Sequence, residues 1–446
     1  MSQYSKKIYK TVAIILNDVR NCSSDNLLLL QRKTMNLSDF GERFRGYSGI
    51  THLMDDLAEG LAQPGTIMLG GGNPAAIPEV MSVFESAIDK LNKSGKLLGA
   101  LANYDGPQGK TLFLESLSEF FRHQYGWEIT RNNIALTHGS QSSFYILFNS
   151  FAGKSGASQK RVLIPLVPEY IGYCDVGVEE GLITSQEARI LHLEDGFFKY
   201  QVDFDNLQVD ESVGLICVSR PTNPSGNVLT DDECRQLDHI AVKQDVPLLI
   251  DNAYGTPFPN IIFNQANPFW NENCIVCMSL SKLGLPGSRT GIVIANEGVI
   301  RFFSNMTAIT SLAPAGLGAE IVNQLITDNA LLPLCDDLIR PFYKRRCEQA
   351  VRLLREAISS PGLHIHKPEG SIFLWLWFDG LKITTSELYQ RLKQKGLLVV
   401  PGKYFFPGQA NVSDHAESCV RMSYAQSEQD LTRGIEILAR ELNACW

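Results

Sequence analysis

The sequence contains no apolar run long enough to cross a membrane and no block of basic residues. A membrane-spanning helix needs about 20 consecutive apolar residues, and the run "TVAIIL" (residues 11–16) is far shorter. Nucleic-acid binding needs clustered positive charge, whereas this chain of 446 residues carries a formal net charge of -8. We therefore expect no membrane partner and no nucleic-acid partner.

Motifs for nucleotide and metal binding are also missing. No "GxGxxG" fingerprint follows a strand-like segment. The segment "GPQGKT" (residues 106–111) resembles the end of a phosphate-binding P-loop, but that motif needs a glycine where Tyr104 stands. The eight histidines show no metal-ligand spacing, so we expect no metal site.

Targeting and redox signals are weak as well. The ten cysteines are scattered and mostly lie in apolar contexts, which is typical of reduced thiols and favours a cytoplasmic protein. Residues 1–34 lack a signal-peptide cleavage pattern. We expect them to be an N-terminal extension that is either disordered or lies upstream of the true start at Met35.

What the sequence does contain is a regular alternation of apolar strands and helices. Near-continuous apolar segments such as "RVLIPL", "GLICVSR" and "IVCMSL" are separated by helical patterns. This alternation indicates an α/β fold with a mostly parallel sheet covered by helices. From about Leu331 the pattern changes to a long charged helix and then to short mixed elements. We expect a large domain over 96–325 and a smaller α+β domain over 326–446, with 35–95 joining the small domain and a substrate loop.

Polar residues gather where the predicted strands end. In an open parallel sheet, ligands bind at the carboxyl ends of the strands. Lys282 follows "IVCMSL", and Arg289 lies seven residues later. A buried ammonium group is costly unless it is paired or chemically consumed. The segments that end strands are "THGSQ", "PEY", "SRPTNPSGN", "DNAYG" and "SLSK".

These residue types match the needs of pyridoxal 5'-phosphate (PLP). A covalent bond between Lys282 and an aldehyde would remove the buried charge. Asp251, in a strand-end "DNAYG", would keep a pyridine nitrogen protonated. A helix start at "THGSQSS", the hydroxyls of Ser279 and Ser281, and Arg289 would bind a phosphate. The pattern therefore predicts a PLP site.

The ordered segments resemble the class I and II aminotransferases of PLP fold type I. The resemblance rests on "NYDGPQG", "GSQ", "PEYIGY", "SRPTNPSGN", "DNAYG", "SLSK…SR" and "RMSY", in order from about residue 68 to residue 425. It implies an aspartate-aminotransferase-like large domain, a homodimer with composite active sites, and ping-pong transfer of an amino group between amino acids and 2-oxo acids. Longer phrases such as "ANYDGPQGKT" and "KPEGSIFLWLWF" favour valine as donor and pyruvate as acceptor. Other amino acid partners, or a β-lyase of the same fold, stay open.

The same resemblance implies roles for particular residues. Lys282 would bond to the cofactor and act as general base, and Asp251 would pair with the pyridinium nitrogen. Asn223 and Tyr254 would hydrogen-bond the ring's 3-oxygen, and Tyr170 would stack on the ring. The phosphate would be bound by Gly139, Ser140, Gln141, Ser279 and Arg289, and by Tyr104 of the other subunit. Substrate would meet Arg421, through its α-carboxylate, together with Asn223, Gly72 and Asn73.

Each assignment has a structural alternative. Asp251 could cap the turn "NAYG", Asn223 could serve only its Pro-Ser-Gly turn, and tyrosines often only pack. A function of another class would be a PLP-binding regulatory module fused to a DNA-binding domain. Residues 1–34 show no helix-turn-helix pattern, so we favour the enzyme.

Overall fold

The computed structural model describes residues 36–45 and 49–446. The chain divides into two units, Met1–Tyr47 and Ser48–Trp446. The described part of the first unit contains one short helix, α3 (Asp39–Arg43), where the hydroxyl of Ser38 accepts a hydrogen bond from Gly41 N. The N-terminal extension predicted for 1–34 lies outside the described residues.

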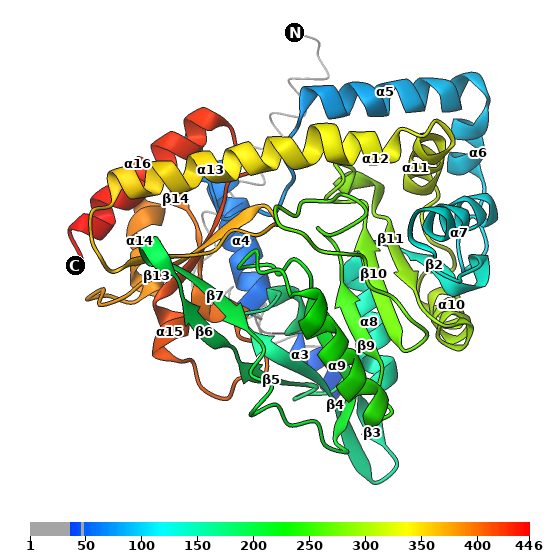
Figure 1. Ribbon diagram of the computed structural model, residues 1–446, viewed down its shortest axis with the longest axis horizontal. Coiled ribbons are helices and arrows are strands. Elements are labelled where there is room, and N and C mark those ends of the chain that lie inside the picture. The colour runs from blue at the N-terminus through cyan, green and yellow to red at the C-terminus, as the bar shows by residue number, and fades with distance from the viewer. Residues whose placement is uncertain (1–35, 46–48) are drawn as a thin grey trace. The chain divides into compact units, whose positions relative to one another are not determined.

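The second unit contains a sheet of eight strands, most of them parallel (Figure 1). Its order is β2-β11-β10-β9-β8-β4-β3, with β5 paired to β4. Strands β11 and β3 run antiparallel to their neighbours, and the remaining pairs are parallel. The predicted mostly parallel sheet is therefore confirmed. The bounds are β2 Ile134–Thr137, β3 Gly153–Ser155, β4 Ser158–Val167, β5 Ile183–Glu187, β8 Val213–Ser219, β9 Leu248–Asp251, β10 Cys274–Ser279 and β11 Gly291–Ile294.

Helices cover both faces of this sheet because both faces of the central strands are apolar. Along β8, Leu215 and Cys217 pack with helices α8 and α10, whereas Ile216 and Val218 pack with α9. Helix α9 begins with a capping box, in which Thr230 and Glu233 bond each other's backbone N–H groups. The bounds are α8 Ser140–Phe151, α9 Asp231–Lys243 and α10 Glu297–Ser311.

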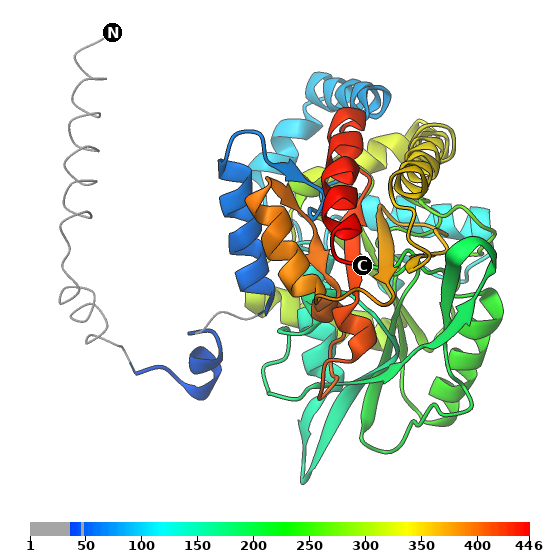
Figure 2. The same ribbon diagram turned by 90° about the vertical axis from the view of Figure 1, so that its left-hand side faces the viewer.

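A second sheet of six strands has the order β15-β16-β13-β12-β7-β6. Four of its strands come from the region predicted as the small domain, but β6 and β7 come from residues inside the range 96–325. Helix α16, red in Figure 1, packs against the long helix α13, and α14 packs against α16 (Figure 2). The bounds are β6 Arg189–His192, β7 Phe197–Gln201, β12 Leu363–His366, β13 Phe373–Phe378, β15 Val400–Pro401, β16 Cys419–Ser423, α13 Arg340–Ala357, α14 Thr385–Gln394 and α16 Glu428–Asn443.

The chain before the large sheet is mostly helical. Its short strand β1 (Ile67–Met68) pairs in parallel with β14 (Leu397–Leu398). Within 36–45 and 49–446, no helix is long and apolar enough to span a bilayer. The remaining helices are α4 Gly49–Ala62, α5 Pro78–Lys93, α6 Lys96–Ala102, α7 Thr111–Tyr125, α11 Leu317–Thr327, α12 Leu331–Pro333 and α15 Asp414–Glu417.

Candidate active site

A cavity of about 160 Å³ lies where β8, β9 and β10 end and α8 begins. The three strands are parallel neighbours, so their carboxyl ends meet at one edge of the sheet. The fold thereby collects residues that are up to 149 positions apart, from Ser140 to Arg289. The predicted site residues that line it are Ser140, Gln141, Tyr170, Asn223, Asp251, Tyr254, Ser279, Lys282 and Arg289.

The amine of Lys282 projects from the loop that follows β10. Its Nζ donates a hydrogen bond to the carbonyl oxygen of Gly72 at 2.6 Å and lies 5.4 Å from the centre of the Tyr254 ring. Burial lowers the pKa of Lys282 to about 8, the cation of Arg421 acts in the same direction, and Asp251 opposes both. An amine with a pKa close to neutral can both accept and release a proton at physiological pH.

The carboxylate of Asp251 stands at the end of β9 and is held by two donors. The phenol of Tyr173 donates to Oδ2 at 2.8 Å, and the backbone N–H of Ala253 donates to Oδ1 at 3.1 Å. Burial raises its pKa to about 6, while Tyr173, Ala253 and Lys282 act in the opposite direction. The side chain thus caps its local turn and also lines the cavity, so the capping alternative does not conflict with the predicted site role.

A close contact between backbone and guanidinium forms one end of the cavity. Gly139 is the N-cap of α8, has a φ of 84°, and receives no side-chain cap. A Cβ atom at position 139 would lie 2.3 Å from Nη2 of Arg289, so only glycine fits there. Arg289 itself has a φ of 47°, a conformation that costs a non-glycine residue roughly 1–2 kcal/mol. The result is a cation beside a helix N-terminus, a combination that favours anions.

Arg421 lies in the middle of β16, buried beside the cavity. Its Nη1 donates to Oδ1 of Asn223 at 2.8 Å and its Nη2 donates to the carbonyl oxygen of Gly70 at 2.7 Å. The guanidinium lies 4.1 Å from the ring centre of Phe373 and 4.8 Å from that of Phe405. Burial lowers its pKa to about 10, so it remains charged at neutral pH. Asn223 is therefore bonded to Arg421 in addition to standing in its turn.

The short segment 69–72 touches both cations in sequence. The carbonyl of Leu69 accepts a hydrogen bond from Ser423 N at 2.6 Å. Gly70 then accepts from Arg421, and Gly72 accepts from Lys282. One short stretch of backbone thus accepts hydrogen bonds from both the buried guanidinium and the amine.

Two predicted residues lie apart from this cavity. Tyr104, between α6 and α7, is 85% exposed and does not line the cavity of its own chain. Asn73 is exposed and lines a separate hollow of about 680 Å³, which it shares with Gly72. Within a single chain, neither side chain takes part in the lysine-containing site.

Sequence reasoning missed three residues behind Asp251. Tyr173 bonds Asp251, Ser219 lines the cavity at the end of β8, and the buried Glu169 bonds Ser219. Their only signal was position, because Ser219 ends β8 and Glu169 and Tyr173 lie in the turn that follows β4. From the sequence alone, Tyr173 looks like an aromatic residue that only packs, and Glu169 looks like a carboxylate in a loop. Neither pattern indicates burial.

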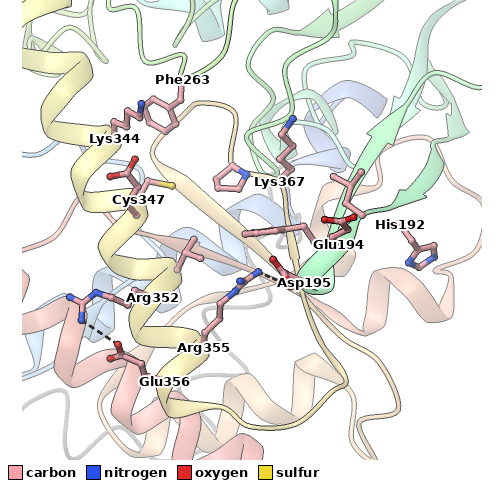
Figure 3. A pocket seen from close by; sticks show the side chains of 15 residues that line it. His192, Glu194, Asp195, Phe263, Lys344, Cys347, Arg352, Arg355, Glu356 and Lys367 are labelled. Atoms are coloured by element: carbon pink, nitrogen blue, oxygen red, sulfur yellow. Dashed lines mark hydrogen bonds and ion pairs between the residues drawn. The ribbon is translucent and has the colours of Figure 1, made fainter.

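A larger cavity lies elsewhere, between α13 and the turn from β6 to β7 (Figure 3). Its volume is about 1180 Å³, and no predicted site residue lines it. Arg355 donates to the carbonyl oxygen of Asp195 at 2.6 Å, and Arg352 pairs with Glu356 at 3.4 Å. Across the described ranges, no group of three or more His, Cys, Asp or Glu could hold a metal ion. Of these two cavities, the smaller one is lined by the predicted site residues.

The family model "Aminotransferase class I and II" matches residues 67–438. A valine–pyruvate aminotransferase of Escherichia coli (strain K12) is 52% identical over 92% of this chain and 99% of its own length. The crystal structure of a valine–pyruvate aminotransferase from Salmonella typhimurium LT2 is 52% identical, with a TM-score of 0.83 over 89% of this chain and 99% of that one. A putative amino-acid aminotransferase from Psychrobacter arcticum 273-4 is 46% identical, with a TM-score of 0.90 over 92% and 99%.

The family model covers the cavity and every residue predicted for it, from Gly72 to Arg421. The resemblance of the sequence motifs, the parallel sheet and the lysine at a strand end agree with this match. The chain belongs to the class I and II aminotransferases, a family of enzymes that depend on pyridoxal phosphate.

Proposed function

We propose that this enzyme transfers the amino group of valine to pyruvate, giving 2-oxoisovalerate and alanine, by a ping-pong mechanism. The observation that carries the proposal is the 52% identity to a valine–pyruvate aminotransferase over 99% of that protein's length. At that similarity and coverage, the substrate pocket and the reactive residues are expected to be retained. Such a reaction belongs to amino-acid biosynthesis.

The residues of the cavity fit pyridoxal phosphate. The phosphate would bind where Arg289 lies against Gly139 at the start of α8, with hydroxyls from Ser140 and Ser279. The side-chain amide of Gln141 already donates to the carbonyl oxygen of Gly172 at 2.7 Å, so Gln141 would offer the phosphate its backbone N–H at the helix start. Asp251 would face the pyridinium nitrogen, Tyr170 would stack on the ring, and Asn223 and Tyr254 would bind its 3-oxygen. When bound, the cofactor supplies an aldehyde for the amino group and a ring that withdraws electrons from the substrate Cα.

Lys282 would move the proton. Once its amine is free, Nζ accepts the proton from the substrate Cα. Its pKa of about 8 suits this exchange. The carbonyl of Gly72 orients the amine, since it accepts from Nζ at 2.6 Å. The ring of Tyr254 stands beside the same amine, and burial raises the pKa of its phenol, which keeps that phenol neutral.

Arg421 would bind the α-carboxylate shared by amino acids and 2-oxo acids. Its guanidinium is already fixed by Asn223, Gly70 and two aromatic rings, while its buried Nε has no partner. A fixed guanidinium loses little freedom when it binds a carboxylate. One arginine can therefore orient both substrates of a ping-pong cycle.

A donor and acceptor panel tests the substrate assignment. Valine with pyruvate should give the highest kcat/KM, with alanine and 2-oxoisovalerate as products and parallel double-reciprocal plots. Discrimination against other apolar donors should be modest, since a methylene contributes only about 1–3 kcal/mol. Higher kcat/KM with another pair would reassign the substrate. Ammonia release without an acceptor would indicate a β-lyase, and absence of any turnover would favour the regulatory alternative.

We also propose a homodimer in which Tyr104 reaches the partner's phosphate site. Tyr104 and Ile309, at 85% and 82% exposure, are large side chains open to solvent. The loop that holds Tyr104 lies beside the connection from α10 to α11, because a Cβ on Gly316 would meet Oδ2 of Asp105 at 2.8 Å. Further exposed apolar residues here are Leu98, Leu101 and Leu312. Such clusters mark interaction surfaces.

Complementation tests this composite site. Tyr104→Phe should weaken cofactor binding by about 1–3 kcal/mol, the cost of leaving a charged acceptor short of one donor. Tyr104→Asp should be inactive alone, because its carboxylate repels the phosphate. A heterodimer of Tyr104→Asp with Lys282→Ala contains one intact site and should recover up to roughly half of the wild-type activity.

The matched control is Val242→Asp, which adds the same charge at an exposed apolar position of α9 and should be fully active alone. If heterodimers confirmed by mass stay inactive, Tyr104 does not complete the partner's site.

We retain the predicted division into a large cofactor domain (96–325) and a small domain (326–446), with 35–95 joining the small domain, as a proposal. A cytoplasmic location is likewise proposed. It is supported by the nine described cysteines, all of which are unpaired.

A further inference from the structure

A second carboxyl group lies buried behind Asp251. Glu169 follows β4 and is 0% exposed, and its carboxyl group makes hydrogen bonds to β8 and to its own loop. Its Oε1 accepts from Ser219 N at 2.7 Å, and its Oε2 accepts from Tyr170 N at 2.9 Å. In the part of the chain that the structure describes, no lysine, arginine or histidine forms an ion pair with it, and no cation is among the groups that shift its pKa. An ionised carboxylate in such a place would be costly.

Glu169 is joined to Asp251 by two hydroxyl groups. Oε2 of Glu169 lies 2.6 Å from Oγ of Ser219, which lies 3.1 Å from the phenol oxygen of Tyr173. That phenol oxygen lies 2.8 Å from Oδ2 of Asp251. The three oxygen–oxygen contacts therefore form one continuous chain between two carboxyl groups.

The number of available protons decides which of these three hydrogen bonds can form. Three oxygen–oxygen hydrogen bonds need three protons, but the hydroxyls of Ser219 and Tyr173 supply only one each. With both carboxyl groups ionised, one of the three contacts would bring two lone pairs together inside the protein. One further proton, on either Glu169 or Asp251, completes the third hydrogen bond. The carboxyl group that carries this proton sets the donor-to-acceptor direction of all three bonds.

We propose that Glu169 holds this proton in the working enzyme and, through Ser219, turns the phenol proton of Tyr173 toward Asp251. Glu169 is then a positioning residue whose uncharged form keeps the negative charge on Asp251. The inference rests on the proposed function only in so far as Asp251 is the group that faces the cofactor.

The surroundings explain why the proton lies on Glu169. Asp251 has Lys282 nearby and opens on the cavity, whereas Glu169 has no cation and no exposed surface. Burial raises the pKa of Glu169 to about 8, with Asp251 adding to the rise, and raises that of Asp251 only to about 6. The other titratable groups that act electrostatically on these hydrogen-bonded residues or on their neighbours are Tyr170, Tyr173, Cys217, Cys277, Lys282, Arg289 and Arg421.

Infrared difference spectroscopy of the holoenzyme, wild type minus Glu169→Gln, tests where the proton lies. At pH 6.5 we expect the carbonyl band of a protonated carboxylic acid, which should fade as the pH rises through about 8. Absence of this band would overturn the proposal. Asp251→Asn serves as the matched variant, and loss of the acid band there with retention in Glu169→Gln would place the proton on Asp251 instead. Neither result depends on which amino acid is the substrate, so a different substrate preference leaves this test intact.

The pH dependence of thermal unfolding tests independently whether Glu169 is protonated. The pKa of Glu169 is raised on folding, so its contribution to stability is complete below the unfolded pKa of about 4.5 and is lost by about pH 8. The Tm of wild type relative to Glu169→Gln should therefore fall between pH 5 and 8 and then level off. Glutamine leaves one backbone N–H without an acceptor in either orientation, but that loss is the same at every pH. A Tm difference that is constant or rises over this range would contradict a protonated Glu169.

The pH dependence of kcat distinguishes a Glu169 that orients the phenol of Tyr173 from a Glu169 that only stabilises the fold. Tyr173→Phe removes the donor to Asp251, so the acid limb of kcat should move up by about one pH unit. Ser219→Ala breaks the chain and should move the limb in the same direction. Glu169→Gln can still donate to Ser219 and should leave the limb in place. Equal shifts in all three variants would mean that Glu169 does not act as a donor.

Discussion

Replacing Lys282 by alanine should lower turnover by roughly 10⁴-fold or more, because covalent attachment and proton transfer are lost together. The structure explains why this loss is expected. Nζ of Lys282 lies in the cavity, donates a hydrogen bond to the carbonyl oxygen of Gly72, and has a pKa lowered to about 8. Cofactor binding through Arg289 and the helix start should remain, but the visible absorption band of the lysine-linked cofactor should be absent.

Single-turnover kinetics with valine, followed by absorbance, measure this loss without interference from product release. The matched control is Lys344→Ala, which removes an exposed lysine from the large cavity of Figure 3 and should leave kcat unchanged. Near-normal single turnover in Lys282→Ala would rule out Lys282 as the proton carrier.

Asp251→Asn should lower kcat by roughly 10²–10³-fold, the scale expected when a fixed charge is removed from a reacting centre. An amide keeps the size of the side chain but carries no charge toward the pyridinium. Its NH₂ group would also face either Tyr173 or Ala253, which are both donors. Asp251→Glu should retain more activity than Asp251→Asn, since it keeps the charge at the expense of position.

Steady-state kcat with saturating valine and pyruvate, together with the Tm of each variant, separates chemistry from folding. Asp238→Asn is the control, because it neutralises a half-buried carboxylate that bonds Asn271, which precedes β10 and so lies at the opposite end of that strand from Lys282. Equal kcat in wild type and Asp251→Asn would show that the charge is not used.

The central strands and the order of the site segments could be predicted from the sequence. Strands β8, β9 and β10 are apolar on both faces, so they stand out as continuous runs, and a parallel sheet follows from their alternation with helices. Once that sheet is assumed, Asp251 and Lys282 must meet at its edge. Local pattern and general topology were sufficient for these residues.

The hairpin of β6 and β7 could not be found in the same way. Its strands are short, and β7 pairs with β12, whose paired residues lie 168 positions later in the chain. Such pairing is fixed by tertiary contacts rather than by local propensity. The hydrogen-bond chain behind Asp251 was missed for a related reason. Nothing in "PEYIGY" shows that Glu169 is buried or that Tyr173 points toward Asp251, since both depend on how β4 lies beside β8.

The contacts of segment 69–72 set a length scale for the reaction. The carbonyl groups of Gly70 and Gly72 hold Arg421 and Lys282 respectively, and two residues of extended chain span at most about 7 Å. An amino acid carries its carboxylate and its reactive hydrogen on adjacent atoms. If Arg421 binds the carboxylate and Lys282 accepts the hydrogen, as proposed, this short backbone connection suits an α-amino acid. A β- or γ-amino acid, whose carboxylate is one or two carbons farther from the reactive hydrogen, would then be mismatched to it whatever its side chain.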